Sequence, residues 1–378
     1  MVKRDLSLDF LKGFACILMV FSHAAIRTVN PALLGLGFFG SFAAILFFSV
    51  SGITAWMQAD HRTPKEILPP YVVLFVAGFS LNGMVQINFY KEFEVQMLQI
   101  IALGASLVFL VEHYFQPRSY YFFITGVLLF FIKILGDLLA QSAFFSQIFN
   151  SSWLQGWLFP PGTFTVIPWL FVFFLGVYAY RASARTNLYL SLLPIAILLG
   201  LLAYSQNPAQ IDLVNKWNMS LSYFLFSCFC LFFSFALVKM FPIKNENITS
   251  RFLLFLGGNS LLFLYVHIFV INVLFKLGMS DYIWLYWPMV LMLSCLLIDV
   301  ILIIYPKTNG TRLFHSKASW LILITCVMLT PLIFEDKTTV FLLEFFWGVC
   351  LSMNYPLLKN IYRVKHPVPT DPDRITVV

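Results

Sequence analysis

Charged residues are scarce in this chain. Only 11% of its 378 residues are Asp, Glu, Lys or Arg, whereas 60% are hydrophobic and the mean hydropathy is +0.85. A water-soluble protein of this length needs more charge on its surface, and several apolar runs reach the roughly 20 residues of a membrane-spanning helix. The composition therefore excludes a soluble globular enzyme and predicts an all-α, polytopic helical bundle in a membrane.

The chain also lacks any cysteine pattern that would indicate a disulfide framework or a metal site. All six cysteines fall inside apolar runs, where a thiol behaves as a small hydrophobic group. Cys228 and Cys230 would point about 200° apart on a helix, so they cannot chelate one ion together. We predict no resident metal.

Nothing in the composition requires a nucleic-acid partner. The 43 Phe and nine Trp residues suit lipid-facing surfaces and interfacial belts. The net charge of +7 is explained by basic loops that remain in the cytoplasm, because membrane proteins concentrate Lys and Arg there. The partner predicted by composition is the lipid bilayer.

Apolar runs bounded by charges, Pro or Gly divide the chain into twelve predicted spans. A single segment after residue 318 would reduce the number to eleven. The rest of the chain is short loops and a Pro-containing tail, which gives a transmembrane domain over 1–358 and a disordered cytoplasmic tail over 359–378. The spans lie near 7–26, 33–57, 68–88, 95–111, 119–140, 163–180, 188–204, 219–240, 252–275, 282–305, 318–334 and 338–357.

The loop charges predict the orientation of the bundle. With the N-terminus in the cytoplasm, seventeen of the 24 Lys and Arg residues lie on the cytoplasmic side, five lie outside and two, Lys12 and Lys133, lie within spans. This asymmetry is a strong positive-inside signal. We therefore expect an integral, multi-pass protein, in a bacterial inner membrane, with both termini in the cytoplasm.

The first span carries an unusual amount of polarity for a membrane helix. Asp9 and Lys12 are three residues apart, so they are neighbours on a helix surface and can pair. Lys12 and His23 are eleven apart, which places them on one face of a helix and roughly 16 Å apart along it. A polar stripe is thus predicted from the cytoplasmic end to the outer end of this helix, lining a path across the bilayer.

Other polar residues in spans have either a functional or a packing role. His267 and Asn259 are eight apart in the ninth span, so they share a face within roughly 80°. Lys133 and Asp137, four apart, are predicted to form a structural ion pair. We expect the acids of two late spans to make hydrogen bonds between helices; these acids are Asp299 and Glu344.

The stripe suggests a chemistry in which two ends of one path act together. Histidine titrates near neutral pH and can take a proton from a hydroxyl or amine as it attacks an acyl group. A cation at the opposite end can hold an anionic group such as a phosphate. An acyl-CoA donor has the extended shape that such a path requires. A proton-coupled transporter or flippase would use the same residues as a relay, and a non-catalytic scaffold is the third possibility.

The opening helix LDFLKGFACILMVFSH resembles that of the transmembrane acyltransferase superfamily, which includes acyltransferase family 3 and relatives of heparan-alpha-glucosaminide N-acetyltransferase. The matching positions are Leu8, Asp9, Lys12, Gly13 and His23, with lysine where the family 3 form usually has arginine. GNSLLFLYVHIF, residues 258–269, is similar to a later span of the superfamily. TFTVIPWLFVFFLGVYAYR, residues 163–181, looks more like the heparan branch.

This resemblance implies transfer of an acyl group, usually acetyl from cytoplasmic acetyl-CoA, to a sugar hydroxyl or amine of an extracytoplasmic glycan or glycolipid. By position, His23 corresponds to the catalytic base. Lys12 corresponds to a cation that binds the donor, with Asp9 orienting it and Arg4 at the same end of the helix.

His267 and Asn259 are the residues we expect to contact the substrate. The sequence does not distinguish direct transfer to the acceptor from transfer through an acyl-histidine, and both routes require His23.

Overall fold

The structure is a computed structural model. It describes residues 5–25, 31–85, 95–141, 157–159, 164–204, 216–245, 247–279, 283–308 and 313–362. Within these ranges the protein is helical and contains no strand, which confirms the predicted fold class. The helices are α1 (Leu6–Ala25), α2 (Pro31–Gly40), α3 (Ala43–Ala59), α4 (Pro64–Val85), α6 (Met97–Phe115), α7 (Ser119–Gln141), α10 (Val166–Arg181), α11 (Ala184–Tyr204), α12 (Leu221–Met240), α13 (Ile248–Gly258), α14 (Ser260–Lys276), α15 (Ile283–Ile304), α17 (Lys317–Ile333) and α18 (Lys337–Ile361), with the 3-10 turn η3 (Tyr305–Lys307).

Helices lie at all twelve predicted segments. In the described part, nine are long and apolar enough to cross a membrane, and the bent pair α13–α14 makes a tenth. The two remaining segments are the shorter apolar helices α10 and α17, of 16 and 17 residues. The protein is therefore an integral, multi-pass membrane protein.

Three predicted boundaries differ from the structure. The second segment is divided into α2 and α3, and the ninth is broken between α13 and α14 with a bend of 90°. Apolar runs mark membrane-length segments but do not show where a helix ends inside one. The last helix continues to Ile361, so the first residues of the predicted tail are helical. The tail beyond residue 362 lies outside the described residues.

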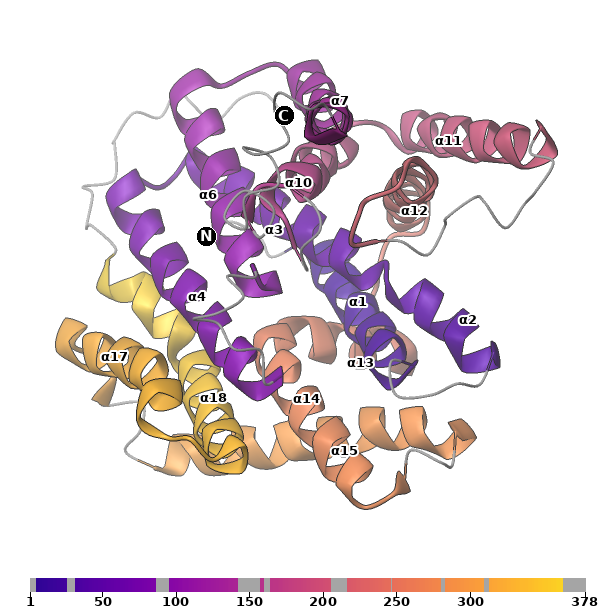
Figure 1. The fold of residues 1–378 in the computed structure, drawn as a ribbon. Helices are drawn as coiled ribbons and strands as arrows, with labels where there is room; N and C mark the ends of the chain where they lie inside the picture. Colours follow the sequence, from indigo (N-terminus) through magenta and orange to yellow (C-terminus); the bar gives the residue numbers. More distant parts are fainter. Residues whose placement is uncertain are drawn as a thin grey trace.

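Helix α1 lies inside the bundle, where it contacts α2, α3, α13, α14 and α15 (Figure 1). Two glycines allow its backbone to approach α13 very closely. A Cβ atom added to Gly13 would lie 1.9 Å from the Leu253 carbonyl oxygen, and one added to Gly257 would lie 1.8 Å from the Asp9 carbonyl oxygen. Because such a contact has no room for a side chain, the two glycines fix how α1 sits against α13.

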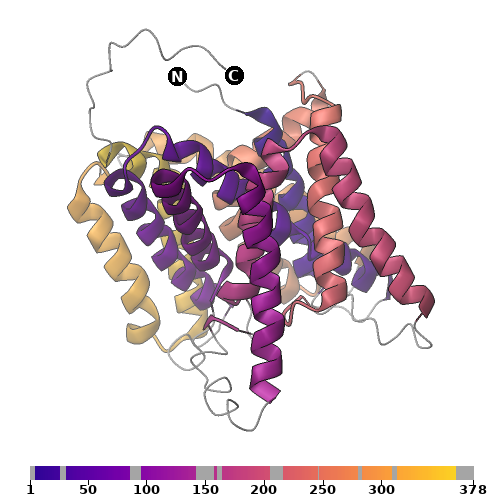
Figure 2. The ribbon, with the colours of Figure 1, turned by 90° about the horizontal axis from the view of Figure 1, so that it is seen from above.

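The rim of the bundle is formed by helices with largely exposed, apolar faces. Only 28% of the spanning window of α7, 22% of that of α11 and 17% of that of the segment containing α15 are buried, against 72% for the segment containing α3. The long helices cross the bundle in nearly the same direction in Figure 2. Exposed apolar side chains on such helices are the surface that faces lipid.

The ends of several helices meet on one side of the bundle, as the predicted topology requires. The Tyr180 hydroxyl, at the end of α10, donates to Asp5 Oδ2 just before α1 (2.8 Å). Lys239, at the end of α12, donates from Nζ to the carbonyl oxygen of Tyr180 (2.5 Å). The sequence predicts that this side is cytoplasmic. His23 lies at the other end of α1, near the opposite side.

Gly257→Ala should destabilise the protein, because its new methyl group would overlap the Asp9 carbonyl oxygen and force α1 away from α13. Overpacking of this kind costs roughly 1–3 kcal/mol or more. Gly200→Ala in α11 is the matched control, since nothing lies within 4 Å of a Cβ atom there. Thermal unfolding of detergent-purified protein, followed by size-exclusion chromatography, measures the difference. Equal melting temperatures for the two variants would contradict the close packing.

Candidate functional site

Two histidines from distant parts of the chain meet inside the bundle. His23 Nδ1, in the last turn of α1, lies 2.8 Å from His267 Nε2 on α14. The two rings are stacked, with centroids 5.0 Å apart and planes 11° from parallel. His267 is fully buried, and the Phe263 ring also stacks on its ring, with the two centroids 5.3 Å apart. The sequence predicts a functional role for both residues but not their contact.

The hydrogen bonds determine which nitrogen atoms carry protons in the neutral pair. His267 Nδ1 lies 2.8 Å from the Phe263 carbonyl oxygen, which can only accept, so this nitrogen carries a proton. His267 Nε2 is then an acceptor, and His23 Nδ1 must donate to it. The lone pair of His23 is left on Nε2. The His23 ring is therefore held by a second histidine, which is itself held by the backbone, and its Nε2 is free of a proton in the neutral pair.

The other end of the stripe is an ion pair beside a cavity. Lys12 Nζ lies 2.8 Å from Asp9 Oδ1, which confirms the predicted pairing of these two residues. Lys12 lines a cavity of about 300 Å³, which we call the inner cavity. Its walls come from α1, α3, α4, α6, α13, α14 and α18, and include Ser51, Gly257, Gly258, Ser260, Ser352 and Tyr355.

A second cavity, here called the outer cavity, contains His23. Its volume is about 100 Å³, and Ser22, Ser41, Gln96 and Lys216 are among its lining residues. Met19, Met97 and Leu264 line both cavities, so these three apolar side chains separate the inner cavity from the outer one. Lys12 and His23 thus belong to adjoining cavities on one side of α1, as the predicted stripe requires.

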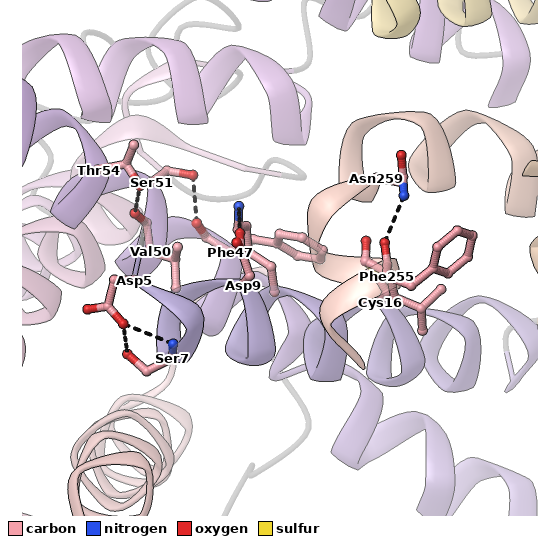
Figure 3. Close-up of polar contacts among 12 residues, drawn as sticks. Asp5, Ser7, Asp9, Cys16, Phe47, Val50, Ser51, Thr54, Phe255 and Asn259 are labelled. Carbon is pink, nitrogen blue, oxygen red and sulfur yellow. Dashed lines mark hydrogen bonds and ion pairs between the residues drawn. The ribbon is translucent and has the colours of Figure 1, made fainter. Parts of the chain in front are cut away.

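Asn259 has a different position from the one predicted. The expectation that it shares a helical face with His267 is wrong, because α13 ends at Gly258 and α14 begins at Ser260 at an angle of 90°. The Asn259 side-chain amide donates back to the Phe255 carbonyl oxygen (2.9 Å), as Figure 3 shows. This residue ends α13 and starts α14, and its contact with a substrate stays a prediction.

Only some of the other polar residues in the spans make the contacts that the sequence predicts. Lys133 Nζ lies 2.6 Å from Asp137 Oδ2, so the predicted ion pair is confirmed. Glu344 is fully buried, but neither of its carboxylate oxygens has a hydrogen-bond partner in the described part of the chain, so the predicted interhelical bond is not formed. Asp299 lies on the exposed side of α15. Arg4 lies outside the described residues.

Lys216 and Gln96 were not predicted as site residues. Lys216 lies just before α12 and outside the membrane-spanning helices, and its Nζ lies 3.4 Å from Ser22 Oγ beside His23. Burial lowers the pKa of Lys216 to about 8. Gln96 precedes α6. The sequence offered no signal for either, because a loop lysine and a glutamine at a helix start are ordinary features outside a known fold.

The fold and the site define a class of protein: a polytopic membrane protein with a hydrogen-bonded histidine pair and a lysine at adjoining cavities. The model of one protein family, described as heparan-alpha-glucosaminide N-acetyltransferase, catalytic, matches residues 4–208, more than half of the chain. The chain belongs to this family, which confirms the resemblance seen in its first helix. A search of curated proteins found no match, and a search of solved structures found none.

Membership of this family makes the protein a membrane acetyltransferase. The matched region contains Asp9, Lys12 and His23, whereas His267 and Lys216 lie beyond it. The structure brings these two parts together, because α14 and the loop before α12 contribute to the surroundings of His23. Among the described residues, no group of three or more His, Cys, Asp or Glu side chains could hold a metal ion.

His267→Phe should reduce acetyl transfer roughly 10²-fold or more, because His23 would lose the acceptor that orients its ring and fixes its proton on Nδ1. His267→Gln should retain more activity, since its side-chain oxygen can accept from His23 Nδ1. Steady-state turnover of purified variants measures both effects. His113→Phe is the control, because His113 contacts the Ala59 carbonyl oxygen on the Asp5 side of the bundle. Full activity in His267→Phe would rule out an orienting role.

Proposed function

We propose that this protein transfers an acetyl group from cytoplasmic acetyl-CoA to a sugar hydroxyl or amine of an extracytoplasmic glycan or glycolipid. The observation that carries the proposal is the arrangement along α1. An oriented base, His23, lies at one end and a cation, Lys12, lies at the other, in adjoining cavities. Loop charges support a cytoplasmic position for the Lys12 end and an extracytoplasmic position for the His23 end.

The inner cavity supplies the donor side. Lys12 offers a positive charge for a phosphate of CoA, while Asp9 holds the ammonium in place through their ion pair. Arg4, close in sequence, adds a second cation at this end. The levels of Lys12 and His23 are roughly 16 Å apart on an ideal helix, so only an extended arm such as pantetheine can reach from one to the other.

In direct transfer, the acceptor oxygen or nitrogen attacks the thioester carbonyl carbon while its proton moves to His23 Nε2. The tetrahedral intermediate then expels the CoA thiolate, and the proton on His23 passes to the sulfur. In transfer through an acyl-histidine, Nε2 attacks the thioester carbonyl carbon and the CoA thiolate leaves. The acceptor then attacks the acyl carbon, the bond from that carbon to Nε2 breaks, and the acceptor proton passes to the thiolate. Both routes use the lone pair on Nε2 that the hydrogen bond to His267 leaves there.

The outer cavity supplies the acceptor side. Its lining combines apolar side chains with a few polar ones, among them Ser22 and Ser41. Polar groups of this kind can orient a sugar hydroxyl or amine toward His23, with His267 behind it. Asn259, at the break between α13 and α14, lies between Gly258 and Ser260, which line the inner cavity.

His23→Ala should abolish acetyl transfer while leaving donor binding unchanged, because the donor cation lies in the other cavity. Purified protein in lipid nanodiscs, given labelled acetyl-CoA and a mixture of amino sugars and glycans, measures the transfer. Mass spectrometry of envelope glycans identifies the acceptor in cells. Wild-type protein that moves protons or lipid-linked sugars but never consumes acetyl-CoA would favour the transporter or flippase instead.

Lys12→Met should weaken acetyl-CoA binding by roughly tenfold or more, since one charge-assisted contact is lost. Lys12→Arg should bind the donor as well or more tightly, because a guanidinium can hold a phosphate through two hydrogen bonds. Equilibrium binding of acetyl-CoA and of CoA to the His23→Ala protein measures affinity without turnover. A loss of affinity in Lys12→Arg would show that Lys12 does not bind phosphate.

A further inference from the structure

Lys216 is a cation without an anionic partner in the part of the chain that the structure describes. Its Nζ lies 3.4 Å from Ser22 Oγ and 4.2 Å from the centroid of the Trp217 ring, and no salt bridge of the described residues includes it. Among the residues that line the outer cavity, His23 is the other ionisable side chain, and its ring contacts His267. Lys216 lines the outer cavity together with His23.

Gln96 provides a second hydrogen-bond donor at the same cavity. Its side chain and that of Gln99 form a reciprocal capping box at the start of α6, which occupies the Gln96 side-chain oxygen. The amide nitrogen, Nε2, is buried and has no hydrogen-bond partner among the described residues. A buried donor without a partner costs free energy, and an acceptor group bound in the outer cavity, which Gln96 lines, would recover it.

We propose that Lys216 Nζ and Gln96 Nε2 form an oxyanion site, which stabilises the negative charge that develops on the carbonyl oxygen of the transferred acetyl group. This inference rests on the proposed function. When the acceptor attacks the carbonyl carbon, the π electrons of the C=O bond move to the oxygen and the acceptor proton moves to His23 Nε2. When the intermediate collapses, those electrons re-form C=O, and the thiolate leaves and takes the proton.

The absence of an acidic partner among the described residues suits Lys216 to this role. A carboxylate partner would neutralise Lys216 in the resting state and compete with the oxyanion. Burial instead lowers the pKa of Lys216 to about 8, so most molecules carry the charge at neutral pH. Because the ammonium is the active form, its contribution is present below about pH 8 and is lost as the pH rises through that value.

The test compares kcat and KM of Lys216→Met, Lys216→Arg and Gln96→Leu with wild type between pH 6 and pH 10. Loss of one oxyanion donor reduces kcat by about 10²–10³-fold, and the KM values for acetyl-CoA and acceptor should change little. Lys216→Arg should keep substantial activity and move the alkaline fall in rate to higher pH, since guanidinium stays charged.

Two variants control for structural damage. Gln99→Leu breaks the same capping box from its other half, and Gln99 is not among the residues that line the outer cavity. Lys276→Met removes an exposed lysine from the same predicted side of the membrane. Both variants should keep kcat within about twofold of wild type, because neither removes an oxyanion donor.

The outcomes separate this inference from the proposed function. Wild-type kcat in Lys216→Met, an unmoved alkaline fall in Lys216→Arg, or a raised acceptor KM with unchanged kcat would each overturn the oxyanion site while His23→Ala remains inactive. If Lys216→Met does not fold, Lys216→Arg and Gln96→Leu decide the question. A wild-type protein without acetyl transfer would overturn the proposed function itself.

Discussion

The close packing of α1 against α13 is the contact on which the rest of the site depends. Gly13 and Gly257 leave no space for a side chain between the two backbones, so α1 can neither rotate nor slide there. Lys12, next to Gly13, is therefore held beside the first turn of α14, and His23, eleven residues later, is held beside His267. One backbone contact thus sets the positions of both Lys12 and His23.

The break between α13 and α14 lets one segment of chain serve two cavities. α13 packs along α1 through Gly257, whereas α14 turns by 90° and carries Leu264 and His267 past the end of the inner cavity. The run Gly257, Gly258, Asn259, Ser260 contains residues typical of helix ends. Because the whole segment is apolar, it was predicted as one span. Hydropathy predicts which residues lie in the membrane, but it does not predict whether their helix is continuous.

The sequence predicted the features that one helix determines alone. Residues three or four apart must be neighbours on a helix, so the pairs of Asp9 with Lys12 and of Lys133 with Asp137 followed from spacing. Contacts between helices depend on packing, which spacing does not encode. The hydrogen bond between His23 and His267, 244 residues apart, therefore appears only in the folded protein.

The two lysines show how their surroundings separate their roles. Lys12 has a carboxylate 2.8 Å away, so its charge is balanced in the resting protein. Lys216 has no such partner among the described residues and lines the same cavity as His23. In a region of low dielectric an unbalanced cation is costly, and its cost is offset only when an anion forms next to it. In the proposed reaction, the oxyanion is an anion of this kind. A permanent carboxylate partner would instead neutralise Lys216 before the reaction begins.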